Sequence, residues 1–119
     1  MQLRQRPYGD AIVVDVFGPV ERETGDTVQL VLALKRLVTE GYKVVLLNMA
    51  RLDNVDSVLL GAIAQAHTTA IRSGTSLKLV NVGERLLELL RMTRLDRFIQ
   101  IVESEDKELK GFRPKPGRG

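Results

Sequence analysis

The sequence predicts an α/β domain built on a mostly parallel β-sheet, and three observations lead to this prediction. Its 119 residues suit a single domain. Segments rich in β-branched and apolar residues alternate along the chain with segments of helical periodicity. The connections between successive strand segments are long enough to hold a helix, which is how parallel strands are joined. The composition, 44% hydrophobic and 28% charged, is that of an ordinary globular domain able to bury a core.

Two strand segments come first. Residues 3–8 have the length of a short edge strand. Residues 11–20 (AIVVDVFGPV) are β-branched and aromatic, which favours a pleated, partly buried surface. Gly18 and Pro19 should end this second strand, because both residues interrupt regular structure.

The first helix is expected to begin at Asp26, which we interpret as its N-cap, and to stop at Gly41. The intervening stretch TVQLVLALKRLVTE has apolar residues at roughly helical spacing. The residues at this spacing include Val28, Leu32, Leu34 and Val38.

A third strand, a loop, a second helix and a fourth strand follow. Residues 42–49 (YKVVLLNM) form a continuous apolar run, typical of a strand covered on at least one face. The polar loop 50–56 leads into a helix over 57–72, which Ser73 and Gly74 end. Residues 76–82 (SLKLVNV) alternate, placing Leu77, Leu79 and Val82 inward.

The last part of the chain contains shorter elements. Gly83 precedes a third helix, ERLLELLRM. Residues 93–98 lead into a final strand at 99–102, and residues 103–109 have the pattern of a short terminal helix. We therefore expect the folded domain to span residues 1–110, followed by a basic, flexible tail at 111–119.

Composition excludes several classes of protein. The net charge of +3 comes from the final ten residues, which hold four basic side chains and no acid, leaving fourteen basic against fifteen acidic residues elsewhere. Aromatic residues are 4%, and we expect no nucleic-acid binding. The chain has no cysteine, no apolar run of membrane-spanning length and no secretory leader pattern. We therefore expect a cytoplasmic protein without membrane insertion.

Residues for catalysis and for cofactor binding are scarce. A single histidine, His67, and no cysteine cannot form an ordinary zinc site, and the glycine-rich phosphate-binding motifs are missing. We expect no cofactor, no metal and no catalytic residues, and we interpret His67 as a surface or half-buried helix residue. A phosphoacceptor receiver domain is disfavoured: although Asp53 follows the third strand, VVDVFGPV offers no acidic pair and IVES no lysine.

The start of the helix at 57–72 is the most informative part of the sequence. Asp56 or Ser57 can accept hydrogen bonds from the free N–H groups of its first turn. An apolar arc suited to docking on a sheet consists of Leu59, Ala62, Ile63, Ala66 and Ala70. A second stripe of small and weakly polar residues consists of Ser57, Leu60, Gly61, Ala64 and Thr68.

That second stripe has two interpretations. Residues 56–71 contain no lysine or arginine, unlike an ordinary solvent-facing helix. Gly61 costs about 1 kcal/mol of helix stability relative to alanine, which suggests that another group approaches closely. Either a neighbouring helix of the same chain covers the stripe, or the stripe is an exposed surface on which a partner docks.

The sequence resembles the STAS domains, in particular the bacterial anti-sigma factor antagonists, from residue 11 to about 109. The resemblance rests on four features in order: the apolar strand ending at Asn48, the D-S-x-x-L-G stretch at 56–61, the Ser73–Gly74 turn before an L-x-L-V strand, and the L-x-x-L-L-x-x-x-x-L-D-x-F pattern ending at Phe98. The family implies a mixed sheet with helices packed mainly on one face.

The resemblance also implies a partner-switching role without catalysis. In that family an unmodified antagonist binds an anti-sigma factor, usually a serine kinase of the ATPase type, and so frees a sigma factor. The kinase then phosphorylates a serine or threonine at the start of the helix after the third strand, and the complex dissociates. The expected partner-binding residues here are Asp53, Asn54, Asp56, Ser57, Val58, Leu60, Gly61, Ala64 and Thr68.

One departure from the family pattern bears on regulation. The family motif commonly reads D-S-[ST]-G-L-G, and the usual acceptor position holds Val58 here. Valine has no hydroxyl group to phosphorylate. Either Ser57, one residue earlier and rotated by about 100° on the helix, is an unusual phosphoacceptor, or the protein is not phosphorylated at this site, which we favour. The alternative function is that of a STAS scaffold or accessory subunit, stressosome-like or transporter-associated, with possible self-association.

Overall fold

The computed structural model describes residues 1–52 and 54–110, so Asp53 and the predicted tail at 111–119 lie outside the described residues. Five strands form one sheet in the order β1-β2-β3-β4-β5: β1 Gln2–Tyr8, β2 Ala11–Phe17, β3 Val44–Asn48, β4 Ser76–Val80 and β5 Gln100–Val102. The helices are α1 Asp26–Thr39, α2 Ser57–Arg72, α3 Glu84–Met92 and α4 Glu105–Glu108, with a 3₁₀ turn at Leu95–Arg97. The predicted strands and helices are all present.

The sheet is mixed but mostly parallel, as predicted. Strand β1 pairs antiparallel with β2 over seven residue pairs, from Gln2–Phe17 to Tyr8–Ala11. Gly9 in the tight turn between them has φ 62°, a conformation that glycine adopts without steric cost. The other neighbouring strands pair in parallel, and each parallel connection carries a helix.

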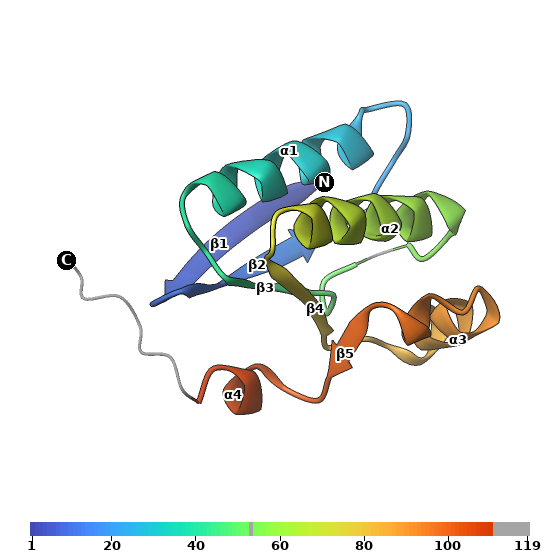
Figure 1. Ribbon diagram of the computed structural model, residues 1–119. Coiled ribbons are helices and arrows are strands. Elements are labelled where there is room, and N and C mark those ends of the chain that lie inside the picture. Colours follow the sequence, from blue (N-terminus) through green and yellow to red (C-terminus); the bar gives the residue numbers. More distant parts are fainter. Residues whose placement is uncertain (53, 111–119) are drawn as a thin grey trace.

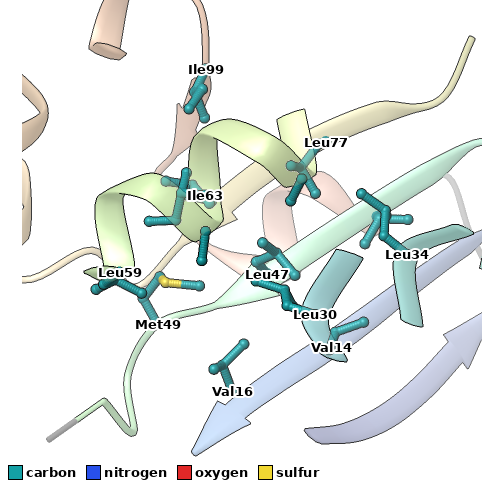
Figure 2. Close-up of a cluster of buried hydrophobic side chains, with 14 of the residues drawn as sticks. Val14, Val16, Leu30, Leu34, Leu47, Met49, Leu59, Ile63, Leu77 and Ile99 are labelled. Atoms are coloured by element: carbon teal, nitrogen blue, oxygen red, sulfur yellow. The ribbon is translucent and has the colours of Figure 1, made fainter. Parts of the chain in front are cut away.

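Helices α1 and α2 lie side by side on one face of the sheet (Figure 1). Figure 2 shows the core between these layers: Leu30 and Leu34 of α1, Leu59 and Ile63 of α2, and Leu47 of β3 point into it. The helices therefore pack mainly on one face, as the family resemblance implied.

Helix α1 buries only part of the apolar pattern in its sequence. Its buried apolar residues are Leu30, Leu34 and Leu37, spaced i, i+4, i+7, whereas Val28 is 61% and Leu32 55% exposed. Val28 and Leu32, although they are among the apolar residues at helical spacing, therefore do not belong to the buried face. Apolar residues occur nearly all around this helix, so its sequence pattern does not single out the arc that meets the sheet.

The N-cap of α1 also differs from the prediction. Gly25, with φ 72°, occupies the cap position and makes no side-chain cap hydrogen bond. Asp26 is the first helical residue and is buried, and its Oδ2 accepts a hydrogen bond from the backbone N–H of Glu21 at 2.8 Å. Asp26 therefore fixes the loop before the helix instead of capping the helix itself.

The opposite face of the sheet has a smaller apolar cluster. Ala11, Val13, Leu46 and Val80 are fully buried there, and Leu109, directly after α4, packs with them. In Figure 1, α4 lies on the side of the sheet away from α1 and α2. One short helix thus contributes to this face, whereas two long helices cover the other.

Candidate functional site

The start of α2 is held by its N-cap. Asp56 has an extended backbone, and its Oδ1 accepts hydrogen bonds from the N–H groups of Val58 at 3.0 Å and Leu59 at 3.1 Å. The helix begins at Ser57 and ends at Arg72, as predicted. Because two of its free N–H groups are satisfied by Asp56, the first turn has a defined geometry. Ser57, the first helical residue, is exposed.

The buried side of α2 is wider than the sequence indicated. All members of the predicted apolar arc are buried: Leu59, Ala62, Ile63, Ala66 and Ala70. Leu60 is also buried, at 9% exposure, so the expectation that it lies on an exposed stripe was wrong. It stands about 100° from Leu59 on the helix, and its long side chain packs into the core cluster at the margin of the arc.

The rest of the small-residue stripe remains uncovered. Ser57, Gly61 and Thr68 are exposed and Ala64 is half-buried. A Cβ atom placed on Gly61 would meet no heavy atom within 4 Å. Within the described residues, Ser57, Gly61 and Thr68 are left open by the neighbouring helix, so the interpretation that the chain covers its own stripe holds for Leu60 and partly for Ala64 alone. The Thr68 hydroxyl donates to the Ala64 carbonyl at 3.1 Å, so it is already satisfied within the helix.

A groove of about 300 Å³ runs beside this stripe, between α2 and the start of α1. Ser57, Val58 and Gly61 line one side, and Thr27 and Val28 the other. The contribution of α1 to this groove was not predicted from the sequence. The available signal was its excess of apolar residues: a helix that buries one stripe does not need Val28 and Leu32 as well.

The loop before α2 is anchored at the end of β3. The Asn48 side chain is buried, and its Oδ1 accepts hydrogen bonds from the Ala50 N–H at 3.1 Å and from Asn81 Nδ2 at 2.8 Å. Asn81 has φ 59°, a left-handed conformation that asparagine tolerates better than most residues. The amide of Asn48 thus ties the loop to the end of β4. Asn54, further along the loop, is exposed.

Asn48 in turn belongs to a charged network on the face of the sheet opposite α2. Its Nδ2 donates to Asp15 Oδ1 at 2.7 Å, and Asp15 also accepts from Arg4 Nε at 2.8 Å and from both Nε and Nη2 of Arg6 at 2.8 and 2.7 Å. Arg6 continues to Glu105 of α4 at 3.0 Å. The sequence analysis did not identify this network.

The network sets the charge states of its members. Burial by itself raises the pKa of the Asp15 carboxyl group, but hydrogen bonds from Arg6, Asn48 and Arg4 outweigh that effect and hold its pKa well below the ordinary value. Hydrogen bonds to Asp15 and Glu105 raise the pKa of Arg6. Asp15 is therefore ionised at neutral pH although its side chain is almost fully buried.

Neither a metal site nor a membrane span is found in the described part of the chain. No group of three or more His, Asp or Glu side chains is arranged to hold a metal ion among residues 1–52 and 54–110. None of the helices there has the length and apolar content to cross a membrane. His67 is half-buried on α2, as expected, and its Nδ1 has no hydrogen-bond partner.

Comparisons with known proteins agree with this architecture. The model of the STAS domain family matches residues 5–108. A Thermotoga maritima protein classed as an anti-sigma factor antagonist is 27% identical over 78 residues, which span 66% of this chain and 69% of that protein.

Three solved structures share the fold at lower sequence identity. The anti-sigma factor antagonist SpoIIAA in its unphosphorylated form superposes with a TM-score of 0.68 at 15% identity, over 92% of this chain and 91% of that one. The Bacillus SpoIIAA structure in the phosphorylated form gives the same TM-score. A sulfate transporter family protein from Wolinella succinogenes superposes with a TM-score of 0.72 at 23% identity, over 86% and 84% of the two chains.

Proposed function

The chain belongs to the STAS domain family, and from that premise we propose that it is a regulatory, non-catalytic binding module of the anti-sigma factor antagonist type. Its partner would be an anti-sigma factor with serine kinase activity of the ATPase type, and the two proteins would bind each other in the cytoplasm. The observation that carries the proposal is the uncovered start of α2: a capped helix end with small exposed side chains beside an open groove.

The chemistry of this surface suits protein docking. Gly61 and Ala64 let a partner backbone come close to the helix, and Val28 adds exposed apolar area across the groove. The proposed partner-binding residues are Asp53, Asn54, Asp56, Ser57, Val58, Gly61, Ala64 and Thr68, with Val28 added from α1. Leu60 is left out because it is buried; it supports the surface from below.

Regulation by phosphate would differ from the family pattern. The usual acceptor position is Val58, which cannot be phosphorylated, and we propose that the protein is not phosphorylated there. Ser57 is exposed, but it stands one residue earlier and faces about 100° away. On this proposal, binding would depend on the amount and state of the partner and not on modification of this chain.

The test is direct binding. The chain would be titrated with ATPase-type anti-sigma kinases from its own source by isothermal calorimetry, alongside the Gly61→Arg variant. We expect wild-type binding and a loss of at least about tenfold in affinity for the variant, because the arginine occupies the open stripe. Thr39→Arg, at the other end of α1, is the matched control and should bind normally.

Two outcomes would contradict the proposal. Unchanged affinity of Gly61→Arg would remove α2 from the interface. Incubation with the bound kinase and ATP, followed by mass spectrometry, should reveal no phosphate at residues 57–61; a phosphorylated Ser57 would show that regulation by modification was retained with a shifted acceptor.

A second candidate function is a scaffold or accessory subunit of a larger complex. The likeness to a sulfate transporter family protein favours keeping it, since the same fold occurs in that context. Concentration-dependent self-association, or co-purification with a membrane transporter or its ATPase, would support the scaffold over the kinase antagonist.

A further inference from the structure

A second concave surface lies at the opposite edge of the sheet from β1. It has a volume of about 670 Å³ and is lined by all three residues of β5, by the 3₁₀ turn and by the last part of α3. Strand β5 is the edge of the sheet: it pairs with β4 and with no other strand in the described part of the chain. The groove therefore runs along backbone that is free to pair on one side.

An exposed aromatic residue lies at this groove. Phe98 lines it and is 68% exposed, although its neighbour Ile99 is buried in the core. Phe98 directly follows the 3₁₀ turn, and its side chain is not among those packed in the core cluster. Met92, at the end of α3, is 71% exposed close by in the sequence. Aromatic residues and methionine are enriched at the buried centres of protein interfaces.

The charge of the groove is positive. Lys78 and Glu108 pair with each other at 2.6 Å and cancel. Arg91 and Arg97 are exposed and form no ion pair with any described residue, and one further acidic residue, Asp96, lines the groove. The groove thus has two unpaired guanidinium groups against one carboxylate.

From the free strand edge, the exposed phenylalanine and the unpaired arginines we infer that this groove binds an extended acidic segment of another protein, which adds to the sheet as a strand beside β5. Backbone hydrogen bonds to β5 would supply the pairing. Arg91 and Arg97 would bind carboxylates, and Phe98 would bury an apolar side chain. The chain's own C-terminal residues are basic, so their charge does not match this site.

The shortness of β5 fits selective binding. A strand of three residues with two arginines in its groove is a poor template for indiscriminate pairing, since short edges and charged side chains oppose it. The carboxylates of an acidic strand would instead be attracted to the two arginine side chains. The groove uses no residue of the α2 surface, so this inference stands independently of the proposed function.

The experiment uses a fluorescein-labelled, eight-residue peptide alternating glutamate and valine, measured by fluorescence anisotropy. A lysine–valine peptide and a peptide methylated at alternate backbone nitrogens are the comparison probes. We expect the acidic peptide to bind at least about tenfold more tightly than either, because the first removes charge attraction and the second removes strand pairing. The largest changes in amide chemical shift on peptide binding should occur at Gln100–Val102.

Variants assign the binding to the groove. Arg91→Glu/Arg97→Glu and Phe98→Ala should each weaken the acidic peptide at least about tenfold, with unchanged circular dichroism, since all three residues are exposed. Lys35→Glu/Arg36→Glu, the same change of charge at two exposed residues of α1, should bind normally. Gly61→Arg should also bind the peptide normally, which separates this site from α2.

Several results would overturn the inference. They are equal binding of the acidic and basic peptides, no binding at millimolar concentration, or full binding by the double variant. Self-association in sedimentation equilibrium that the double variant abolishes would identify a second copy as the occupant instead. Binding to phosphatidylglycerol vesicles, lost in the same variant without any peptide binding, would identify a lipid surface.

Discussion

The two faces of the sheet are built on different principles. The face under α1 and α2 is a continuous apolar core with large interlocking side chains, as Figure 2 shows for Leu47, Leu59 and Ile63. The opposite face combines a small apolar cluster with a charged network centred on Asp15. The first face depends on volume, and the second depends on donors, acceptors and charge.

The two faces of the sheet contribute differently to the stability of the domain and to the position of its proposed binding loop. The apolar core fixes the layers but does not discriminate finely among side chains of similar volume. The polar network is directional, and through Asn48 it reaches the loop that leads to α2. Stability therefore comes mainly from one face, whereas the position of the proposed binding loop depends on the other.

The largest effect is expected from truncation in the apolar core. Ile63→Ala should lower the free energy of unfolding by about 2–5 kcal/mol, because the residue is fully buried between α2 and the sheet. Ile63→Val should cost only about 0.5–1.5 kcal/mol. Urea unfolding measures both. Equal losses of stability in the two variants would contradict the conclusion that this face depends on the volume of its buried side chains.

An isosteric change should disrupt the polar face. Asp15→Asn keeps the shape of the side chain but removes the charge that Arg4 and Arg6 share, and it presents an amide donor to other donors. We expect the free energy of unfolding, measured with urea, to fall by about 2–3 kcal/mol. This loss is smaller than that expected for a fully buried ion pair, because the side chains of both arginines are partly exposed to solvent. A neutral result would mean that the network adds no stability.

The same network should make stability depend on acid. Because the folded-state pKa of Asp15 lies below its unfolded value, its contribution is fully present above about pH 4 and is lost as the pH falls towards the folded pKa. The stability difference between wild type and Asp15→Asn should therefore shrink between pH 4 and pH 2. A constant difference across that range would contradict the ionised state assigned to Asp15.

A smaller effect is expected at the N-cap of α2. Asp56→Ala should cost about 1 kcal/mol, because the N–H groups of Val58 and Leu59 lose their acceptor. Asp56→Ser should recover most of that stability, since serine also caps helices well. Thermal unfolding followed by circular dichroism measures the series, and no recovery with serine would mean that the carboxylate acts by more than capping.

The smallest expected effect has the opposite sign. Gly61→Ala should raise the free energy of unfolding by about 0.5–1 kcal/mol, because alanine favours the helix and its Cβ meets no neighbour. The partner-binding assay should show whether even one methyl group disturbs docking. Destabilisation by alanine would mean that the stripe is more crowded than the structure shows.

The sequence by itself determined the local structure. Alternation of apolar and helical segments predicted the order of the elements, and Asp56 and Ser57 marked the start of α2 because capping depends on residues two or three apart. The apolar arc of α2 was also predicted, since its five members recur at helical spacing. The open stripe beside it was one of two alternatives that the sequence left.

The tertiary structure decided which surfaces meet. Val28 is exposed and Leu60 is buried because packing against the sheet and the neighbouring helix determines which side of each helix is buried. The helical periodicity of the sequence alone is compatible with several buried sides. The Asp15–Asn48 hydrogen bond joins residues 33 positions apart, which are brought together only by the parallel pairing of β2 with β3. Short-range propensity therefore fixed the elements, whereas long-range packing placed the groove, the network and the free edge of β5.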